Sequence, residues 1–373
     1  MKALDQRSTW IEINKNALLE NVRTLKGVLP LGCKAMFVVK SNAYGHGLLQ
    51  VLSILKSEKS VDAFGVFSFE DALLVKSKTN KKVVVLQTFE ASWVGVASKR
   101  GIELTVSHFD QLEYLQKKKF SQKLKVHLKV DTGLGRQGFL KKDIEVVSQF
   151  IAKMKNISLV GLYTHLSGAE SKEFDSYTIK QYKELLAWKE SLNEAGLYPE
   201  VHTSATSGVI RKSDLACNMV RFGIGMYGLW PSSETKNNKT HLLPVLSFKT
   251  KVVEAKILPA GSFIAYDCTC ELKKKTMIAV LPVGYWDGLP REASARAKVL
   301  IRGKECPILG RVMMNMCVVD ASLASGVTKG DIVTIIGKDG NQEISAEDLA
   351  KASKTINYEI VTRINPLLSR KIV

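Results

Sequence analysis

Residues 34–40, KAMFVVK, form a short apolar run that ends in a lysine. The run from Met36 to Val39 is typical of a buried β-strand, and the glycine-rich stretch SNAYGHG (41–47) follows it. One interpretation is that Lys40 only marks the point where the strand leaves the core and meets water. The other is that a partly desolvated lysine at a rigid strand end loses its proton and acts as a nucleophile toward a carbonyl carbon.

Similar β-rich runs recur before residue 222, and amphipathic, helix-like stretches separate them. The further runs are 61–67, 82–88, 102–106, 124–131, 157–165, 200–204 and 218–221. In one helix-like stretch, Ser107 and Asp110 are spaced as in a capping box. Eight strands alternating with helices favour an α/β fold with a closed (β/α)8 barrel of the TIM type, and an open doubly wound sheet is the alternative.

The pattern changes at WPSSETKNNKTHL (230–242), which is rich in Pro, Ser, Asn and Lys and is typical of a linker. After it the hydrophobic period is two, as in half-buried strands, and one helix is predicted at SAEDLAKAS, opened by Ser345. We therefore expect a barrel domain at 10–235 and a mostly β C-terminal domain at 241–373, with residues 1–9 as a candidate to pack on the second domain.

Composition is that of a globular protein in a reducing compartment. The 373 residues are 45% hydrophobic and 24% charged, which is ordinary for a soluble domain. The first residues lack the apolar core of a signal peptide, and no apolar run is long enough to span a membrane. The six cysteines show no zinc-site spacing. We expect a cytoplasmic protein without a metal site.

The net charge of +18 raises the possibility of nucleic-acid binding. Basic residues cluster at 76–82, 117–120 and 272–276, but no aromatic side chains that could stack on bases are interleaved with them. Solvated surface is the interpretation that we favour.

The stretch GIGMYG (223–228) matches the GxGxxG pattern of dinucleotide-binding proteins. It follows the last predicted barrel strand and leads into the linker, so no second strand completes a βαβ unit. We expect no nicotinamide or flavin here. The glycines still allow backbone N–H groups to approach a phosphate, as in barrel loops that follow the last strands.

Polar residues follow several of the predicted barrel strands. In a (β/α)8 barrel the carboxyl ends of the strands share one face, where active sites lie. The residues expected there are Lys40, Lys129, Asp131, Arg136, His165, Ser204, Thr206 and Arg221. Taken singly, His165 is more often a structural histidine, and Lys129 could form an ion pair with Asp131 inside the barrel. Taken together, the set predicts a reaction site.

Six motifs extend this set along nearly the whole chain. They are VVKSNAYGHG (38–47), KVDTGLGRQGF (129–139), GLYTHL (161–166), VRFGIGMYGL (220–229), LPVGYWDGLPR (281–291) and GRVMMNM (310–316). In sequence and order they resemble the alanine racemases, pyridoxal-phosphate (PLP) enzymes built from a barrel and a β-domain. The resemblance implies interconversion of L- and D-alanine, which supplies D-alanine for cell-wall peptidoglycan, by a homodimer with shared active sites.

The resemblance also implies a role for each matching residue. Lys40 would bond the cofactor and act as one catalytic base, and Tyr266 would be the second base, contributed by the opposite subunit. The cofactor-binding residues would be Lys40, Tyr44, His165, Ser204, Thr206, Arg221, Gly223, Ile224 and Tyr358. Arg136 and Met314 would hold the substrate carboxylate, and Lys129 resembles a lysine that is carbamylated in some members of the family.

The implied reaction explains why these residue types are needed. Racemisation removes a weakly acidic proton from one face of the α-carbon and returns one to the other face, so two bases are required. A free tyrosine, with a pKa of about 10, is a poor base at neutral pH, and His165 and Arg221 are candidates to support Tyr266. A permanently charged arginine at the cofactor ring nitrogen would disfavour protonation of that ring and limit side reactions.

Three departures from the family pattern affect substrate and cofactor contacts. The stretch TSATSG leaves open which of Ser204, Thr206 and Ser207 binds the phosphate. Asn315 replaces a carboxylate at the expected substrate entrance, and Asp267 and Cys270 replace a commoner glycine and aromatic. The alternatives are a racemase for larger amino acids, a related PLP decarboxylase and, in a different class, a PLP-binding protein without turnover.

Overall fold

The computed structural model describes residues 8–236 and 240–373. Contacts within the chain divide it into two compact units, which we name the barrel unit and the sheet unit. The barrel unit comprises Leu19–Lys40 and Leu52–Leu243. The sheet unit comprises the residues up to Leu18, then Ser41–Val51 and Pro244–Val373. Every helix in the described ranges is too short or too polar to cross a membrane.

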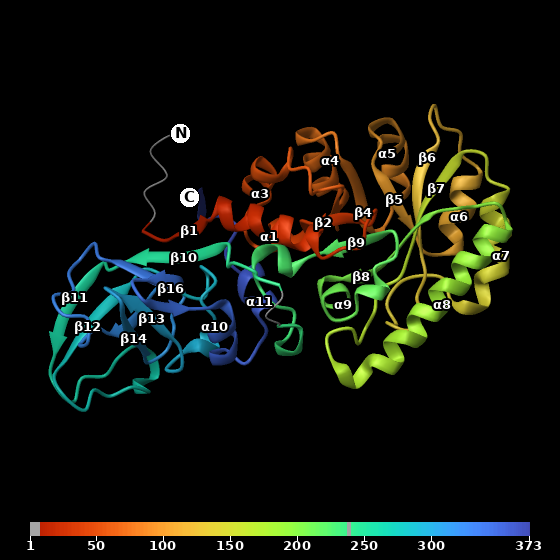
Figure 1. The fold of residues 1–373 in the computed structure, drawn as a ribbon. Coiled ribbons are helices and arrows are strands. Elements are labelled where there is room, and N and C mark those ends of the chain that lie inside the picture. Colours follow the sequence, from red (N-terminus) through yellow and green to blue (C-terminus); the bar gives the residue numbers. More distant parts are fainter. Residues whose placement is uncertain (1–7, 237–239) are drawn as a thin grey trace. The chain divides into compact units, whose positions relative to one another are not determined.

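In the described chain, the barrel unit holds a closed barrel of parallel strands (Figure 1). The strands are β2 (Lys34–Val38), β3 (Ala63–Val66), β4 (Lys82–Thr88), β5 (Glu103–Val106), β6 (Leu124–Lys129), β7 (Ile157–Tyr163), β8 (Glu200–Ala205) and β9 (Met219–Phe222). They pair in chain order, and β9 closes the barrel on β2 with Ala35 opposite Val220. The predicted (β/α)8 barrel is confirmed, and the open-sheet alternative is wrong.

Burial on both faces explains why the barrel strands read as apolar runs. All four residues of β3 and of β5 are buried, and in β2 the run Ala35–Val38 is buried as well. Strands of parallel sheets are covered on both sides, so they show continuous hydrophobic runs rather than alternation. The polar residues inside β5 and β6 are therefore exceptions that need hydrogen-bond partners.

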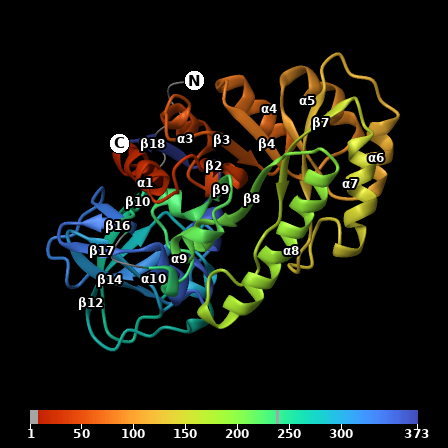
Figure 2. The same cartoon turned by 45° about the vertical axis from the view of Figure 1, so that its right-hand side comes forward.

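Helices connect the strands, and α4 to α8 flank the barrel on its outside (Figure 1 and Figure 2). The helices up to β9 are α1 (Lys15–Gly27), α2 (Lys40–Tyr44), α3 (Leu48–Leu55), α4 (Phe69–Lys78), α5 (Val94–Arg100), α6 (Phe109–Gln116), α7 (Ile144–Ala152), α8 (Asp175–Glu194) and α9 (Thr206–Arg211). The capping box predicted at Ser107 is wrong. Helix α6 begins at Phe109, and the Ser107 N–H donates instead to the Gln111 side chain at 2.9 Å.

The sheet unit is built on one large sheet in the order β11-β12-β15-β14-β13-β16-β10-β1-β18, with β17 paired to β16. Its strands are β1 (Trp10–Ile13), β10 (Leu246–Lys251), β11 (Glu254–Leu258), β12 (Thr276–Leu281), β13 (Lys298–Ile301), β14 (Lys304–Leu309), β15 (Cys317–Asp320), β16 (Ile332–Asp339), β17 (Gln342–Ile344) and β18 (Ser369–Ile372). The mostly β C-terminal part predicted from the period of two is confirmed.

The N-terminal boundary differs from the expected start of the barrel at residue 10. Strand β1 pairs antiparallel with β10 and parallel with β18, so it completes the sheet rather than the barrel. The Thr9 hydroxyl lies 2.7 Å from that of Thr250, so the end of the segment 1–9 does pack on this unit. Residues 1–7 of that segment lie outside the described residues.

Two helices follow the last long strand, where one was predicted. Helix α10 (Ala346–Ala352) is capped as expected, because the Ser345 hydroxyl accepts the Asp348 N–H at 3.0 Å. Helix α11 (Asn357–Thr362) was not predicted. The predicted linker 230–242 includes residues 237–239, which lie outside the described residues, and the boundary between the units falls just after it, at Pro244.

Candidate active site

Lys40 follows the first barrel strand, and the backbone beyond it takes an unusual path. Ser41, Asn42, Ala43 and Tyr44 all have φ of 53° or 54°, so they form a turn of left-handed helix. This left-handed conformation costs about 1–2 kcal/mol per residue for residues other than glycine. The Asn42 side chain supports the turn, because its Oδ1 accepts the Leu48 N–H at 2.8 Å. Strain of this kind is found mainly at functional sites.

The Lys40 amine is electrostatically prepared to lose its proton. Burial lowers its pKa, and the positive charge of Arg136 lowers it further. A lowered pKa increases the fraction of neutral amine at neutral pH, and the neutral amine is the nucleophilic and basic form. The second interpretation of Lys40, as a reactive group, is the one that its environment supports.

Two tyrosines expected to contact a phosphate lie together in the sheet unit. Tyr44, in the left-handed turn, and Tyr358, on α11, have ring centroids 6.3 Å apart. Burial raises the pKa of Tyr44, so its hydroxyl stays protonated and remains a hydrogen-bond donor. Gly45 is required behind Tyr44, because its φ is 79° and a Cβ there would overlap the carbonyl oxygen of Val361.

Arg221, on β9, is the most heavily hydrogen-bonded of the expected site residues. Its Nη1 donates to Nδ1 and to the carbonyl oxygen of His202, both at 2.8 Å. Its Nη2 donates to the carbonyl oxygens of Thr164 and Thr203, both at 2.7 Å, and lies 3.3 Å from His165 Nδ1. Among the described residues its Nε–H makes no hydrogen bond. One donor of a fixed guanidinium is therefore left for a ligand.

His165 and Lys129 lie in the electric field of Arg221. Burial, followed by the charges of Arg221 and Lys129, holds the pKa of His165 well below its usual range. Burial, followed by the charges of Arg221 and Arg136, likewise holds the pKa of Lys129 well below its usual range. His165 is therefore neutral at neutral pH, Lys129 gives up its proton more readily than a free lysine, and Arg221 carries the buried positive charge, since its pKa is lowered only to about 10.

The ion pair considered for Lys129 and Asp131 does not form. The Lys129 amine lies 4.7 Å from the centre of the Tyr163 ring. Asp131 instead accepts the backbone N–H groups of residues 133–136 at 2.7 to 3.1 Å, which holds the loop that carries Arg136. That alternative is wrong because the backbone donors of the loop occupy the carboxylate.

The buried hydroxyls of Ser204, near the end of β8, and Thr206, just after it, make different hydrogen bonds. Ser204 Oγ donates to the carbonyl oxygen of Leu215 at 2.8 Å. Thr206 Oγ1 accepts the Gly223 N–H at 3.3 Å, so its own hydrogen remains available for a ligand. Ile224 follows Gly223 and begins the 3-10 helix η5 (Ile224–Tyr227). Neither α9 nor η5 has a side-chain cap, so their first N–H groups, like the Thr206 hydroxyl, can serve an anion.

The residues of the barrel unit fit PLP by the chemistry of their donors. They offer a lysine amine for the aldehyde, one unused guanidinium donor for the ring nitrogen, and hydroxyl and backbone donors for the phosphate. No cluster of three metal-ligating side chains occurs within residues 8–236 and 240–373.

Tyr266 and Met314 lie in the sheet unit and are exposed, with 67% and 56% of their surface accessible. Tyr266 sits between two residues with positive φ, Ala265 at 61° and Asp267 at 64°. Asp267 forms an ion pair of 2.8 Å with Arg311, which anchors this strained segment. The structure thus presents the tyrosine outward on a held loop.

Two residues near Arg221 were missed by sequence reasoning. His127 Nδ1 lies 3.0 Å from His202 Nε2, and His127 Nε2 lies 2.8 Å from Glu103 Oε2. Both Glu103 and His127 are buried in barrel strands. The available signal was a charged or polar residue inside a run otherwise expected to be buried on both faces.

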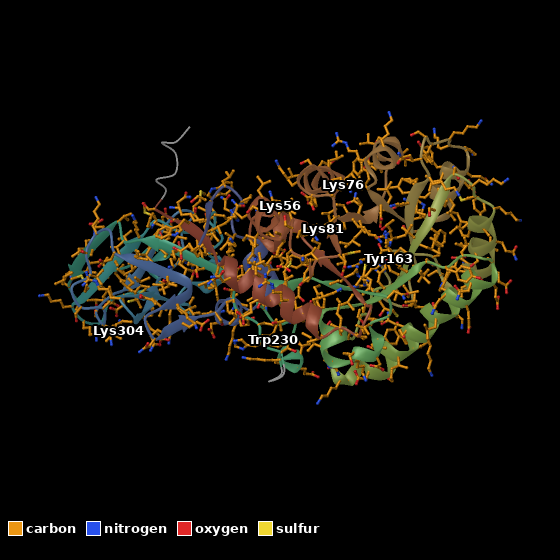
Figure 3. The ribbon with its side chains drawn as sticks, turned by 45° about the horizontal axis from the view of Figure 1, so that its top comes forward. Lys56, Lys76, Lys81, Tyr163, Trp230 and Lys304 are labelled. Carbon is orange, nitrogen blue, oxygen red and sulfur yellow. The ribbon has the colours of Figure 1, made fainter. Side chains whose placement is uncertain are left out.

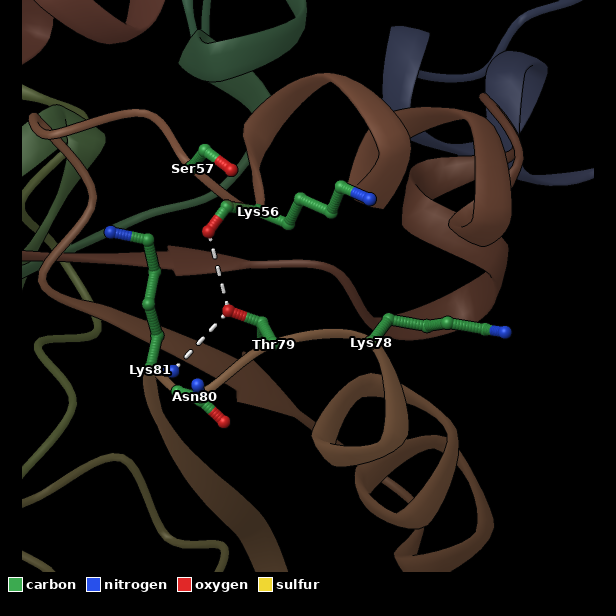
Figure 4. Close-up of a pocket in the computed structure, with 6 residues that line it drawn as sticks. All are labelled: Lys56, Ser57, Lys78, Thr79, Asn80 and Lys81. Carbon is green, nitrogen blue, oxygen red and sulfur yellow. Dashed lines mark hydrogen bonds between the residues drawn. The ribbon is translucent and has the colours of Figure 1, made fainter.

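A surface cavity of about 440 Å³ in the barrel unit lies away from these residues (Figure 4). Its lining residues are Lys56, Ser57, Lys78, Thr79, Asn80 and Lys81. The Thr79 hydroxyl donates to the carbonyl oxygen of Lys56 at 3.3 Å and accepts the Lys81 N–H at 3.2 Å. These loops lead into β3 and β4, so the cavity is at the amino ends of the strands, opposite the face expected to carry the chemistry.

Comparisons with known proteins identify the family to which the chain is similar. The family model "Alanine racemase, N-terminal domain" matches residues 13–231, and "Alanine racemase, C-terminal domain" matches residues 245–372. The alanine racemase of Leptospira interrogans is 34% identical over 99% of this chain and 97% of that protein. That of Methanococcus maripaludis is 34% identical over 97% of both.

Solved structures are similar over the same length. The alanine racemase from E. faecalis superposes with a TM-score of 0.92 at 32% identity and covers 98% of both chains. The Bacillus anthracis alanine racemase, solved with bound L-Ala-P, superposes with a TM-score of 0.90 at 33% identity, over 98% of this chain and 95% of that chain.

Proposed function

The chain belongs to the alanine racemase family, and we propose that it interconverts L-alanine and D-alanine with PLP as cofactor. The observation that carries the proposal is Lys40 at the carboxyl end of a barrel strand, where burial lowers its pKa, on a barrel that also holds Arg221 with one unused donor. We further propose that the reaction takes place in the cytoplasm and supplies D-alanine for peptidoglycan.

When bound, PLP would supply the electron sink that makes the proton on the α-carbon of alanine removable. Lys40 would bond the cofactor covalently, and Arg221 would donate its Nε–H to the ring nitrogen. His165, which already lies beside Arg221, would contact the ring. The neutral state of His165 leaves Arg221 as the charged group at this end of the site.

We propose that Thr206, rather than Ser204, carries the hydroxyl that contacts the phosphate. The Ser204 hydrogen is used by the Leu215 carbonyl, whereas the Thr206 oxygen accepts from Gly223 and keeps its hydrogen for a ligand. Ser207, buried on the same first turn of α9, is the alternative. The N–H groups that begin η5, at Gly223 and Ile224, and the hydroxyls of Tyr44 and Tyr358 would complete the phosphate site.

Lys40 and Tyr266 would act as the two bases on opposite faces of the α-carbon. The lowered pKa of Lys40 supports its role, because a neutral amine accepts a proton directly. Arg136, whose backbone N–H donates to the Asp131 carboxylate at 2.7 Å, would pair with the substrate carboxylate, and Met314 would contact the same group.

The second base would come from a second copy of the chain. Tyr266, Tyr285, Trp286, Met314 and Met316 are large and exposed in the sheet unit. Two of them are held side by side, because the Trp286 N–H donates to the carbonyl oxygen of Met314 at 3.0 Å. Exposed apolar side chains that lie together on a surface are typical of interaction sites, and a two-fold interface lets each chain give and receive the same residues.

The direct test of function is chiral analysis of L-alanine incubated with the protein and PLP, followed by mapping of the cofactor. Appearance of D-alanine, with a pyridoxyl label on Lys40 after borohydride reduction and digestion, is expected. Lys129→Ala is the matched control, because Lys129 is a second lysine in the barrel unit with a lowered pKa and should leave the label in place. A label on another lysine, or no D-alanine from protein that binds PLP, would refute the proposal.

A further inference from the structure

A chain of hydrogen bonds runs through the barrel from Glu103 on β5 to Arg221 on β9. Glu103 Oε2 lies 2.8 Å from His127 Nε2, and His127 Nδ1 lies 3.0 Å from His202 Nε2. His202 Nδ1 lies 2.8 Å from Arg221 Nη1. At most 5% of any of the four residues is exposed, so water does not substitute for these links.

The two ends of the chain determine the direction of every hydrogen bond in it. Arginine only donates, so His202 Nδ1 must accept and the His202 proton must be on Nε2. His202 Nε2–H donates a hydrogen bond to His127 Nδ1, so the single proton of neutral His127 lies on Nε2 as well. An ionised carboxylate only accepts, so Glu103 accepts the hydrogen bond from His127 Nε2–H. The Arg221 donor at one end and the Glu103 acceptor at the other therefore require the same tautomer, with the proton on Nε2, in both histidines.

The charge states of the groups agree with this direction. Burial would raise the pKa of Glu103, but its hydrogen bond to His127, with smaller contributions from the charges of Lys82 and Lys125, leaves it below its usual range. Burial, followed by the charge of Arg221, holds the pKa of His202 well below its usual range, so this ring is neutral. A buried anion thus stands at one end and a buried cation at the other.

Packing in the barrel is arranged around the two histidine rings. A Cβ at Gly161 would overlap the His127 ring, so glycine on β7 makes the space that this ring occupies. The Tyr163 ring, which Figure 3 shows in the barrel unit, stacks on His202 with centroids 4.6 Å apart and planes at 7°. The Tyr163 hydroxyl is held in turn by Thr105 at 2.8 Å. The rings are therefore fixed in orientation as well as in hydrogen bonding.

We propose that Glu103 and His127 are positioning residues that lock His202 in its Nε2–H tautomer and so hold Arg221 in place. A His202 proton on Nδ1 would face the Arg221 Nη1–H and break the contact. The consequence for catalysis rests on the proposed function: with Nη1 and Nη2 held, the Nε–H of Arg221 is kept as the donor toward the cofactor ring.

The first test uses the protein without cofactor and is independent of activity. In protein labelled with ¹⁵N-histidine, NMR should show His127 and His202 both protonated on Nε2 and not on Nδ1. Glu103→Gln should keep this pattern, because its amide oxygen can still accept, whereas Glu103→Leu should give His127 a mixture of tautomers. An Nδ1–H tautomer on either histidine of the unmodified protein would overturn the proposal.

The second test measures the consequence in the protein loaded with PLP. In metal sites, removing the outer hydrogen-bond partner of a ligand typically costs about ten- to a hundredfold in affinity or activity. By analogy, we expect a loss of that order in kcat for Glu103→Leu, with KM changed little. The pH profile of cofactor absorbance should shift in Glu103→Leu and stay in place in Glu103→Gln. Glu113→Leu, at an exposed position on α6, is the matched control.

Outcomes of the two tests separate the possible failures. If Glu103→Leu lowers only the unfolding midpoint and leaves the tautomers, the absorbance profile and kcat unchanged, the residue is merely structural and the proposal is wrong. If Glu103→Leu does not fold, the tautomers of the unmodified protein and of Glu103→Gln still decide. Absence of racemisation in the unmodified protein would refute the proposed function but leave the tautomer result standing.

Discussion

Four basic side chains in the barrel unit, Lys40, Lys129, His165 and His202, have pKa values below their ordinary ranges. For each of them burial is the largest cause, and a neighbouring arginine or lysine is the next. Arg221 stays charged among them because its pKa starts far higher. Burial and the neighbouring charges of Arg221 and Arg136 thus favour the neutral forms of these bases, and a neutral lysine can take a proton.

His46 gives a prediction about stability and pH in the sheet unit. Its pKa is lowered to about 4, first by burial, and its Nδ1–H donates to the carbonyl oxygen of Tyr44 at 2.9 Å. The unfolded chain takes up a proton near pH 6.5 while the folded chain does not, so the free energy of unfolding falls as the pH is lowered from about 6.5 toward 4. Between about pH 6.5 and pH 5 this group alone should cost about 1.5 kcal/mol.

The matched variant is His46→Asn, whose side-chain amide can still donate to Tyr44 but does not titrate. Urea unfolding of both proteins at several pH values should show a smaller loss of stability toward acid in the variant. His165 and His202 contribute with the same sign in both proteins, so they cancel in the comparison. Equal pH dependence of the two proteins would contradict a neutral, buried His46.

Residues at strand ends could be predicted individually, whereas residues that act within the barrel could not. Lys40 and Arg221 follow or lie in apolar runs, and the geometry of a barrel brings such positions to one face. Glu103 begins β5 and His127 lies inside β6, both at buried positions, and nothing in either run indicates which neighbour the polar side chain contacts. Only the closed barrel shows that His127 is directed at His202.

At the scale of elements, the left-handed turn Ser41–Tyr44 is held by what surrounds it. Its residues do not favour positive φ, apart from asparagine, so nothing in SNAY predicts it. The turn persists because the backbone that follows is fixed: the Gly45 carbonyl accepts from Arg370 Nε at 2.9 Å. Gly45 fits there because it has no Cβ.

Replacement of Gly45 by alanine should therefore strongly lower the free energy of unfolding, whereas the same replacement at Gly27 should be tolerated. Gly45→Ala would place a Cβ on the Val361 carbonyl oxygen at a φ of 79°, and we expect a loss of about 3 kcal/mol in the free energy of unfolding. Gly27→Ala, at the end of α1, meets no atom within 4 Å and should not destabilise, because alanine favours the helix by about 1 kcal/mol. Urea unfolding measures both; equal effects would show that Gly45 is not sterically required.

Elements that depend on local pattern were predictable, and those that depend on distant partners were not. The barrel strands are continuous apolar runs because parallel strands are buried on both faces. Strand β1 is also apolar, but its partners β10 and β18 lie more than 200 residues away in the sequence. The short α11 has no side-chain N-cap, so the usual start signal is missing.

At the scale of the whole molecule, we propose that the site takes residues from two chains. Lys40 belongs to the barrel unit, whereas Tyr266 is exposed on the sheet unit. Lys40→Ala and Tyr266→Phe should each be inactive as a pure protein. Mixed under exchanging conditions, they should regain activity, because each mixed dimer contains one site with both bases.

The complementation experiment has its control in the subunit exchange itself. Exchange is verified by mass measurement of differently labelled chains. Exchange without recovery of activity would mean that Lys40 and Tyr266 act within one chain, or that Tyr266 is not a base.

The central claim, two bases on opposite faces, is tested most directly by exchange of the α-hydrogen of alanine with deuterated water in Tyr266→Phe. By analogy with the family, Lys40 takes the proton of D-alanine and Tyr266 that of L-alanine. Racemisation in both directions should fall by about 10²- to 10⁴-fold, the usual contribution of a positioned acid or base. Exchange of D-alanine should persist through Lys40 while exchange of L-alanine is lost. Equal loss for both enantiomers, with PLP still bound, would mean that one base serves both faces and would contradict the account.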